Sequence, residues 1–119
     1  MGRVFLVDDH APVRSALRLL LEHEDDIDVV GETGDAARVA AEVALVHPDL
    51  VLLDWALVEQ AARELIGAVR QAWGAARVVA LSCRPEDLAP AREAGADGFV
   101  CMGEPPEVMV RTLRAVLAS

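Results

Sequence analysis

The chain has 119 residues, of which 54% are hydrophobic and 26% are charged, and its formal net charge is −9. This length suits one domain with one core, and so much apolar material excludes an intrinsically disordered chain. The acidic balance argues against a nucleic-acid-binding surface on this domain, and neither a membrane-spanning stretch nor a signal-peptide pattern occurs. We therefore expect one domain over residues 1–119, in the cytoplasm and without contact with a membrane.

Apolar runs alternate with amphipathic stretches along the whole chain. In chain order, the pattern predicts a strand at Arg3–Val7, a helix at Pro12–Glu22, a strand at Ile27–Glu32, a helix at Gly34–Val46 and a strand at Leu50–Leu53. It continues with a helix at Ala61–Trp73 that ends at Gly74, a strand at Arg77–Ser82, a short helix after Pro85, a strand at Gly98–Cys101 and a last helix at Pro106–Leu117. This alternation predicts an α/β fold in which helices cover both faces of a parallel sheet.

Three aspartates follow two of the predicted strands. Asp8 and Asp9 come directly after the first apolar run, and Asp54 comes after the third. In open parallel sheets, ligands bind beyond the carboxyl ends of the strands, where the strand order reverses. Three like charges at one edge repel each other unless a cation lies among them, and Mg²⁺ prefers oxygen ligands. The sequence therefore predicts a small acidic metal pocket, the alternative being that each aspartate merely ends its strand.

Two cysteines, Cys83 and Cys101, lack the spacing of metal ligands. We expect both to be reduced, partly buried thiols. Lysine is absent, so all eleven basic residues are arginine.

Short motifs then give a resemblance to a known family. They are Val7-Asp8-Asp9-His10, Asp54 and Ser82 at strand ends, and Gly95-Ala96-Asp97-Gly98-Phe99-Val100. Because these motifs occur in this order, the chain resembles the response-regulator receiver domain of two-component signalling over essentially its whole length. It is most similar to receivers of helix-turn-helix (NarL/LuxR-type) regulators. The resemblance implies a doubly wound, five-stranded parallel sheet of flavodoxin/CheY-like (βα)5 type, with strand order 2-1-3-4-5.

The resemblance also implies roles for single residues. Asp54 would be the phosphate acceptor, Ser82 the switch hydroxyl and Phe99 the switch aromatic. The expected protein ligands of Mg²⁺, which Mn²⁺ can replace, are Asp8, Asp9, Asp54 and the backbone carbonyl of Ala56. The alternatives are a loop serine satisfying local backbone at Ser82 and ordinary core packing at Phe99. His10 follows the acid pair and is interpreted as a solvated loop residue rather than a metal ligand.

The implied partners are a sensor histidine kinase or a small-molecule phosphodonor, and a homodimer. DNA would be bound only through an output domain that this chain lacks. The domain would not be an enzyme beyond catalysing its own phosphotransfer and slow autodephosphorylation.

Several positions depart from the family pattern. Met102 stands three residues after Phe99, where the family has a lysine, and a thioether cannot supply an ammonium charge. Val58 and Ala62 stand where a proline and a glycine are usual. The stretch from Ser82 to Phe99 is also shorter than usual and carries Pro90 inside the expected helix. Arg84 could replace the missing cation, but a solvent-facing arginine is the favoured interpretation.

Two functions of different classes remain open. The leading hypothesis is a phosphate-driven switch, because none of the acidic residues is lost. The alternative is an atypical receiver that acts without phosphorylation as a dimerisation or protein-docking module, which Met102 and the altered loops favour. A phosphatase or phosphotransferase is the weakest hypothesis, since no second nucleophile or general base stands out.

Overall fold

The computed structural model describes residues 2–119, which form a five-stranded parallel sheet in the order β2-β1-β3-β4-β5. The strands are β1 (Gly2–Val7), β2 (Ile27–Thr33), β3 (Leu50–Asp54), β4 (Arg77–Ser82) and β5 (Gly98–Cys101). The predicted fold class and strand order are therefore confirmed. The order reverses between β1 and β3, which lie side by side at the centre of the sheet.

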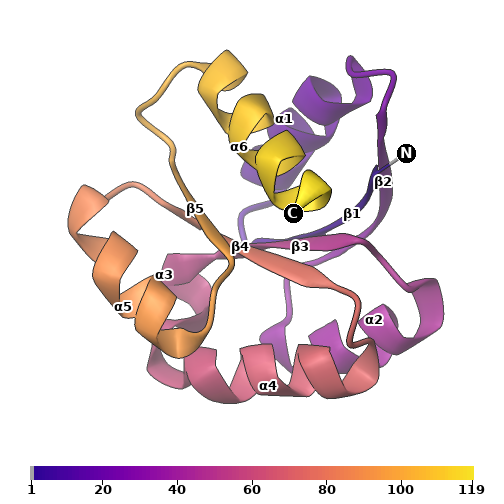
Figure 1. The fold of residues 1–119 in the computed structure, drawn as a ribbon, viewed down its shortest axis with the longest axis vertical. Helices are drawn as coiled ribbons and strands as arrows, with labels where there is room; N and C mark the ends of the chain where they lie inside the picture. Colours follow the sequence, from indigo (N-terminus) through magenta and orange to yellow (C-terminus); the bar gives the residue numbers. More distant parts are fainter. Residues whose placement is uncertain (1) are drawn as a thin grey trace.

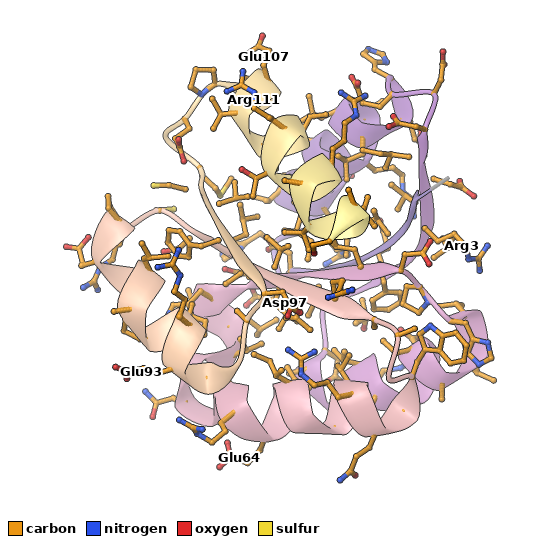
Figure 2. The ribbon with its side chains drawn as sticks, viewed as in Figure 1. Arg3, Glu64, Glu93, Asp97, Glu107 and Arg111 are labelled. Atoms are coloured by element: carbon orange, nitrogen blue, oxygen red, sulfur yellow. The ribbon has the colours of Figure 1, made fainter. Side chains whose placement is uncertain are left out.

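Helices cover both faces of this sheet (Figure 1). The helices are α1 (Ala11–Glu22), α2 (Val39–Val46), α3 (Trp55–Val58), α4 (Ala62–Ala72), α5 (Leu88–Ala94) and α6 (Pro106–Ala118). Short 3-10 turns precede three of them, at η1 (Ala36–Arg38), η2 (Glu59–Ala61) and η3 (Pro85–Asp87). Helices α1 and α6 lie on one face, and α2 to α5 lie on the other. Charged side chains such as Glu64 and Glu93 project outward from α4 and α5 (Figure 2).

The sheet separates two hydrophobic cores. Successive side chains of a strand point to opposite faces, so Val4 and Leu6 pack under α1 and α6, whereas Phe5 and Val7 pack under α2 and α4. All four side chains are at most 1% exposed. Burial on both sides explains why the central strands are continuously apolar in sequence. It also explains why Asp8 and Asp54 appear only where the strands leave the cores.

Several helix boundaries differ from the prediction, and for two of them the structure shows the reason. The helix expected from Gly34 begins later, because the Asp35 side chain accepts a hydrogen bond from the Ala37 N–H at 3.0 Å and starts the 3-10 turn η1. The helix expected to end at Gly74 stops at Ala72, because Trp73 turns into an extended conformation. The Trp73 ring stacks there on His47, with ring centroids 4.0 Å apart.

Pro90 lies inside the helix that follows β4, as expected, but its missing N–H costs that helix no hydrogen bond. It is the third residue of α5, within the first turn. Backbone N–H groups of a first turn have no acceptor inside their own helix. The proline therefore removes no intrahelical hydrogen bond, and the helix continues to Ala94. Within residues 2–119, no helix is both long and apolar enough to cross a membrane.

Candidate functional site

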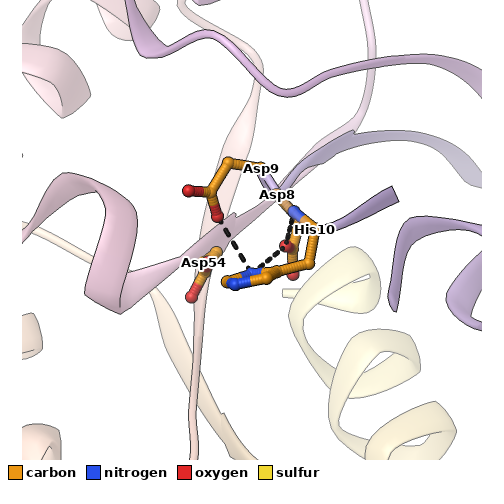
Figure 3. Close-up of side chains that lie close together, drawn as sticks. All are labelled: Asp8, Asp9, His10 and Asp54. Carbon is orange, nitrogen blue, oxygen red and sulfur yellow. Dashed lines mark hydrogen bonds and ion pairs between the residues drawn. The ribbon is translucent and has the colours of Figure 1, made fainter. Parts of the chain in front are cut away.

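Three carboxylates and an imidazole meet at the carboxyl edge of the sheet (Figure 3). Asp8, Asp9 and His10 follow β1, and Asp54 is the last residue of β3. Strands β1 and β3 pair directly, with Val7 opposite Leu53, so Asp8 and Asp54 continue adjacent strands. One ligand atom of each of the four side chains lies within 4.8 Å of the other three. The structure thus brings together the aspartates that the sequence places at strand ends.

Asp8 and Asp9 differ in their surroundings. Asp8 is only 3% exposed, and its Oδ1 accepts the backbone N–H of His10 at 2.8 Å. Asp9 is exposed to solvent. The His10 Nδ1 lies 3.0 Å from Asp9 Oδ1 and 3.4 Å from Asp8 Oδ1. His10 is solvent-exposed as expected, but that interpretation missed its contact with both carboxylates, for which its place next to the acid pair was the available signal.

The surroundings of Asp54 raise the pKa of its side chain. Burial raises the pKa of Asp54 to about 6, and the Asp8 and Asp9 carboxylates add to this increase. The backbone amide of Ala56 and the nearby His10 act in the opposite direction. Loss of solvation and like charges both disfavour the ionised form. A cation among these carboxylates would reverse the effect.

The donor set fits a small, hard divalent cation. Mg²⁺ holds oxygen ligands at about 2.1 Å, so opposite ligands of one ion are about 4.2 Å apart. The four side-chain atoms span at most 4.8 Å, and three of the four are carboxylate oxygens. Only small movements would therefore bring them around one ion. Ala56, the expected backbone ligand, is the second residue of α3 and directly follows this edge of the sheet.

Ser82 and Phe99 lie on the neighbouring strands. Asp54 on β3 pairs with Leu81 on β4, so Ser82 lies one residue beyond the level of Asp54. Ser82 is 7% exposed, and its Oγ donates to Asp87 Oδ2 at 2.6 Å. Phe99, on β5, is partly buried against the core under α4 and α5. The Ser82–Asp87 contact was missed because it depends on the fold of the η3 turn.

The departures from the family pattern have visible structural consequences. Val58 and Ala62 are 4% and 3% exposed, so the residues replacing proline and glycine pack into the core as part of α3 and α4. The short helix α3 was not predicted, since four residues are too few to show a helical period. Met102 is 45% exposed and lines an apolar groove of about 330 Å³ between α1 and α6.

Arg84 is exposed, as the favoured interpretation expected. Both cysteines are free thiols. Cys101 is partly buried as expected, whereas Cys83 is exposed because it lies in the loop after β4, so its expected burial was wrong.

Comparison with known proteins places this site in a family. Residues 4–114 match the model of the response regulator receiver domain. The chain belongs to this receiver family. The resemblance inferred from the motifs is thereby confirmed.

Similar full-length proteins are transcription regulators of the NarL/LuxR type. The nitrate/nitrite response regulator protein NarP of Escherichia coli K12 is 31% identical over 115 residues, which cover 95% of this chain and 54% of that protein. The virulence factors putative positive transcription regulator BvgA of Bordetella pertussis is 33% identical over 122 residues, covering 98% of this chain and 56% of that protein. The receiver chain thus spans about half the length of these curated relatives.

Solved structures agree with the fold. A two-component response regulator of the LuxR family from Aurantimonas superposes with a TM-score of 0.86 at 33% identity, covering 99% of this chain and 86% of that one. The signal receiver domain of the putative response regulator NarL from Mycobacterium tuberculosis gives the same TM-score at 26% identity, with 99% and 97% covered.

Proposed function

We propose that this receiver domain accepts a phosphoryl group on Asp54 in the presence of Mg²⁺ and thereby switches an output domain or partner. The observation that carries this proposal is the convergence of Asp8, Asp9 and Asp54 at the point where the strand order reverses. Three carboxylates so close together are electrostatically costly without a cation. A function that brings both a cation and a phosphoryl group to this edge accounts for that cost.

The chemistry is nucleophilic attack by a carboxylate. An Asp54 carboxylate oxygen attacks phosphorus, and the phosphorus–nitrogen bond of a kinase phosphohistidine, or the phosphorus–oxygen bond of a small phosphodonor, breaks. The leaving group departs with the electron pair, and Asp54 becomes an aspartyl phosphate. With a pKa of about 6, Asp54 is mostly ionised at neutral pH and ready for this attack.

Asp8, Asp9, Asp54 and the Ala56 carbonyl would hold the metal. Bound Mg²⁺, or Mn²⁺ in its place, supplies positive charge that neutralises the phosphoryl oxygens. Asp8 is already fixed by the His10 N–H, so it needs little reordering to hold the ion or one of its waters. Asp9 must exchange its contact with the His10 ring for the cation.

Phosphorylation of Asp54 would act on residues of the neighbouring strands β4 and β5. Ser82 would donate a hydrogen bond to the phosphoryl group, and Phe99 would change its rotamer with the state of the site. The domain's partners would be a sensor histidine kinase or a small phosphodonor in the cytoplasm, and a second copy of the chain in a homodimer. DNA would be bound only through an output domain.

A second candidate function is an atypical receiver that docks or dimerises without phosphorylation. Two observations favour it. The Ser82 hydroxyl is already committed to Asp87, and residue 102 is a methionine without charge. The acidic cluster is intact, however, and a docking module has no need of it. We therefore rank the phosphate switch first.

Intact-mass measurement tests the proposal. The wild-type domain is incubated with acetyl phosphate, with and without Mg²⁺, and we expect one phosphoryl addition that depends on the metal. Asp54→Ala should show none, while Asp28→Ala, which removes an exposed aspartate of β2, should behave as wild type. No addition to the wild type with Mg²⁺ present would overturn the phosphate switch and leave the docking module.

A further inference from the structure

The hydroxyl of Ser82 is hydrogen-bonded within its own loop. Its Oγ donates to Asp87 Oδ2 at 2.6 Å and accepts the backbone N–H of Arg84 at 2.9 Å. A serine hydroxyl has a single proton. An O–H···O⁻ distance of this length is typical of strong, charge-assisted hydrogen bonds. The one proton that Ser82 could offer to a phosphoryl group is therefore bound to a carboxylate.

The η3 turn holds Asp87 in this position. Pro85 starts the turn, and the Asp87 backbone N–H donates to the Arg84 carbonyl at 3.1 Å. The same loop thus supplies both partners of the Ser82 hydroxyl. Because Ser82 is 7% exposed, loss of these partners would leave a buried polar group unsatisfied. The contact is consequently stable in the unphosphorylated domain.

Asp87 is bound to a hydroxyl on the strand next to Asp54. Asp54 pairs with Leu81, which immediately precedes Ser82. A phosphoryl group on Asp54 would be a second negatively charged acceptor for the single Ser82 proton, in competition with the Asp87 carboxylate. The chain has no lysine to offset this charge, and Arg84 is exposed. Phosphorylation and the Ser82–Asp87 hydrogen bond therefore oppose each other.

We propose that Asp87 is a positioning residue that holds the Ser82 hydroxyl in the unphosphorylated arrangement, so that the hydrogen bond between them must break before Ser82 binds the phosphoryl group. The inference rests on the proposed function and deepens it. Asp87 raises the threshold for switching, and its removal makes the domain respond more readily.

The test is a titration of the domain with beryllofluoride, an inert phosphoryl mimic, at fixed Mg²⁺ concentration, followed by amide NMR. Asp87→Ala should bind the mimic about tenfold more tightly than wild type, which corresponds to about 1.4 kcal/mol. Asp87→Asn keeps an acceptor without the charge and should show a smaller gain. Glu86→Ala is the matched control, because it removes the adjacent, exposed acid of the same turn and should bind as wild type.

A double variant separates positioning from simple charge repulsion. In a Ser82→Ala background there is no hydroxyl to release, so Asp87→Ala should lose most of its gain. In the free domain, Asp87→Ala should also shift the Arg84 amide signal, since that N–H donates to Ser82 Oγ.

Equal affinity of Asp87→Ala and wild type, or an undiminished gain in the Ser82→Ala background, would overturn this inference alone. If no variant binds beryllofluoride, the proposed function falls, and the inference falls with it.

Discussion

Asp54 combines partial burial with two carboxylate neighbours, and its proton affinity follows from that combination. Its pKa is raised from 3.8 to about 6, first by burial and then by Asp8. The folded domain therefore binds this proton more tightly than the unfolded chain does. The stabilising contribution is fully present below about pH 4 and is lost as the pH rises through about 6. An empty, ionised site is thus a source of instability at neutral pH.

This linkage predicts the effect of Asp54→Asn on folding. Without divalent cations, the variant should be more stable than wild type at pH 7.5 and about equally stable at pH 4. A two-unit shift corresponds to at most about 3 kcal/mol, and solvent screening of a partly exposed carboxyl reduces the expected gain to about 1 kcal/mol. Urea unfolding at both pH values measures it, with exposed Asp28→Asn as control. A gain at pH 4 equal to that at pH 7.5 would contradict the linkage.

The carboxylates also predict cation binding in the absence of phosphate. Mg²⁺ or Mn²⁺ should bind weakly, because bound waters supply several of the ligands. Trp55 is 4% exposed and directly follows Asp54, so its fluorescence should report the titration. Asp9→Asn should weaken binding by about tenfold, or 1.4 kcal/mol.

Two control variants test whether the fluorescence change comes from Trp55 and from a cation at the acidic pocket. Asp25→Asn removes an exposed aspartate from the loop between α1 and β2 and should leave the titration unchanged. Trp73→Phe should preserve the response, because Trp73 stacks on His47 rather than beside Asp54. An unaltered titration in Asp9→Asn would mean that Asp9 is not a ligand.

At the scale of elements, strands β4 and β5 link the acidic pocket to the rest of the domain. Ser82 pairs with Cys101, and the Met102 N–H donates to the Ser82 carbonyl at 2.8 Å. The backbone of residue 102 is therefore held beside the backbone of Ser82. Its thioether lines the groove between α1 and α6 and has no charge to offer a phosphoryl group.

Met102→Lys should consequently strengthen switching. A hydrogen bond to a charged group is worth about 1.5–3 kcal/mol, whereas complete reversal of a two-state equilibrium needs about 5.5 kcal/mol. We expect beryllofluoride to shift the wild-type domain only partly, and Met102→Lys to shift it further. Amide spectra that follow Ser82, Phe99 and α5 measure the shift. Met102→Gln, similar in size but uncharged, is the control.

Full switching of the wild-type domain, with no gain from Met102→Lys, would contradict this expectation. Another cation, such as the Arg84 guanidinium, would then already occupy the place of the lysine.

For the whole molecule, the sequence predicted the features that depend on long-range repetition. Alternating apolar runs located all five strands, and the bounds of β4 and β5 were predicted without error. Strand ends also located Asp8, Asp9 and Asp54, because parallel strands bring their carboxyl ends to one edge. These signals are strong because two buried cores impose them on many residues at once.

Features that depend on local geometry were missed. The helix α3 is too short to show a helical period in the sequence. The residue after α4, Trp73, is extended rather than left-handed, so Gly74 is not needed as a cap of that helix. Two contacts depend on loop conformation: that of His10 with the carboxylates, and the hydrogen bond from Ser82 to Asp87. Sequence alone gives the residues of such loops but not the directions of their side chains.

The central claim is that Asp54 accepts phosphate, and one mixed reaction tests it most directly. Wild type and Asp54→Ala differ in mass, so both can be incubated in one tube with acetyl phosphate and Mg²⁺ and resolved by intact-mass spectrometry. We predict that only the wild-type peak gains a single phosphoryl group and that a chelator abolishes the gain. Equal labelling of both proteins, or labelling of neither, would contradict the assignment.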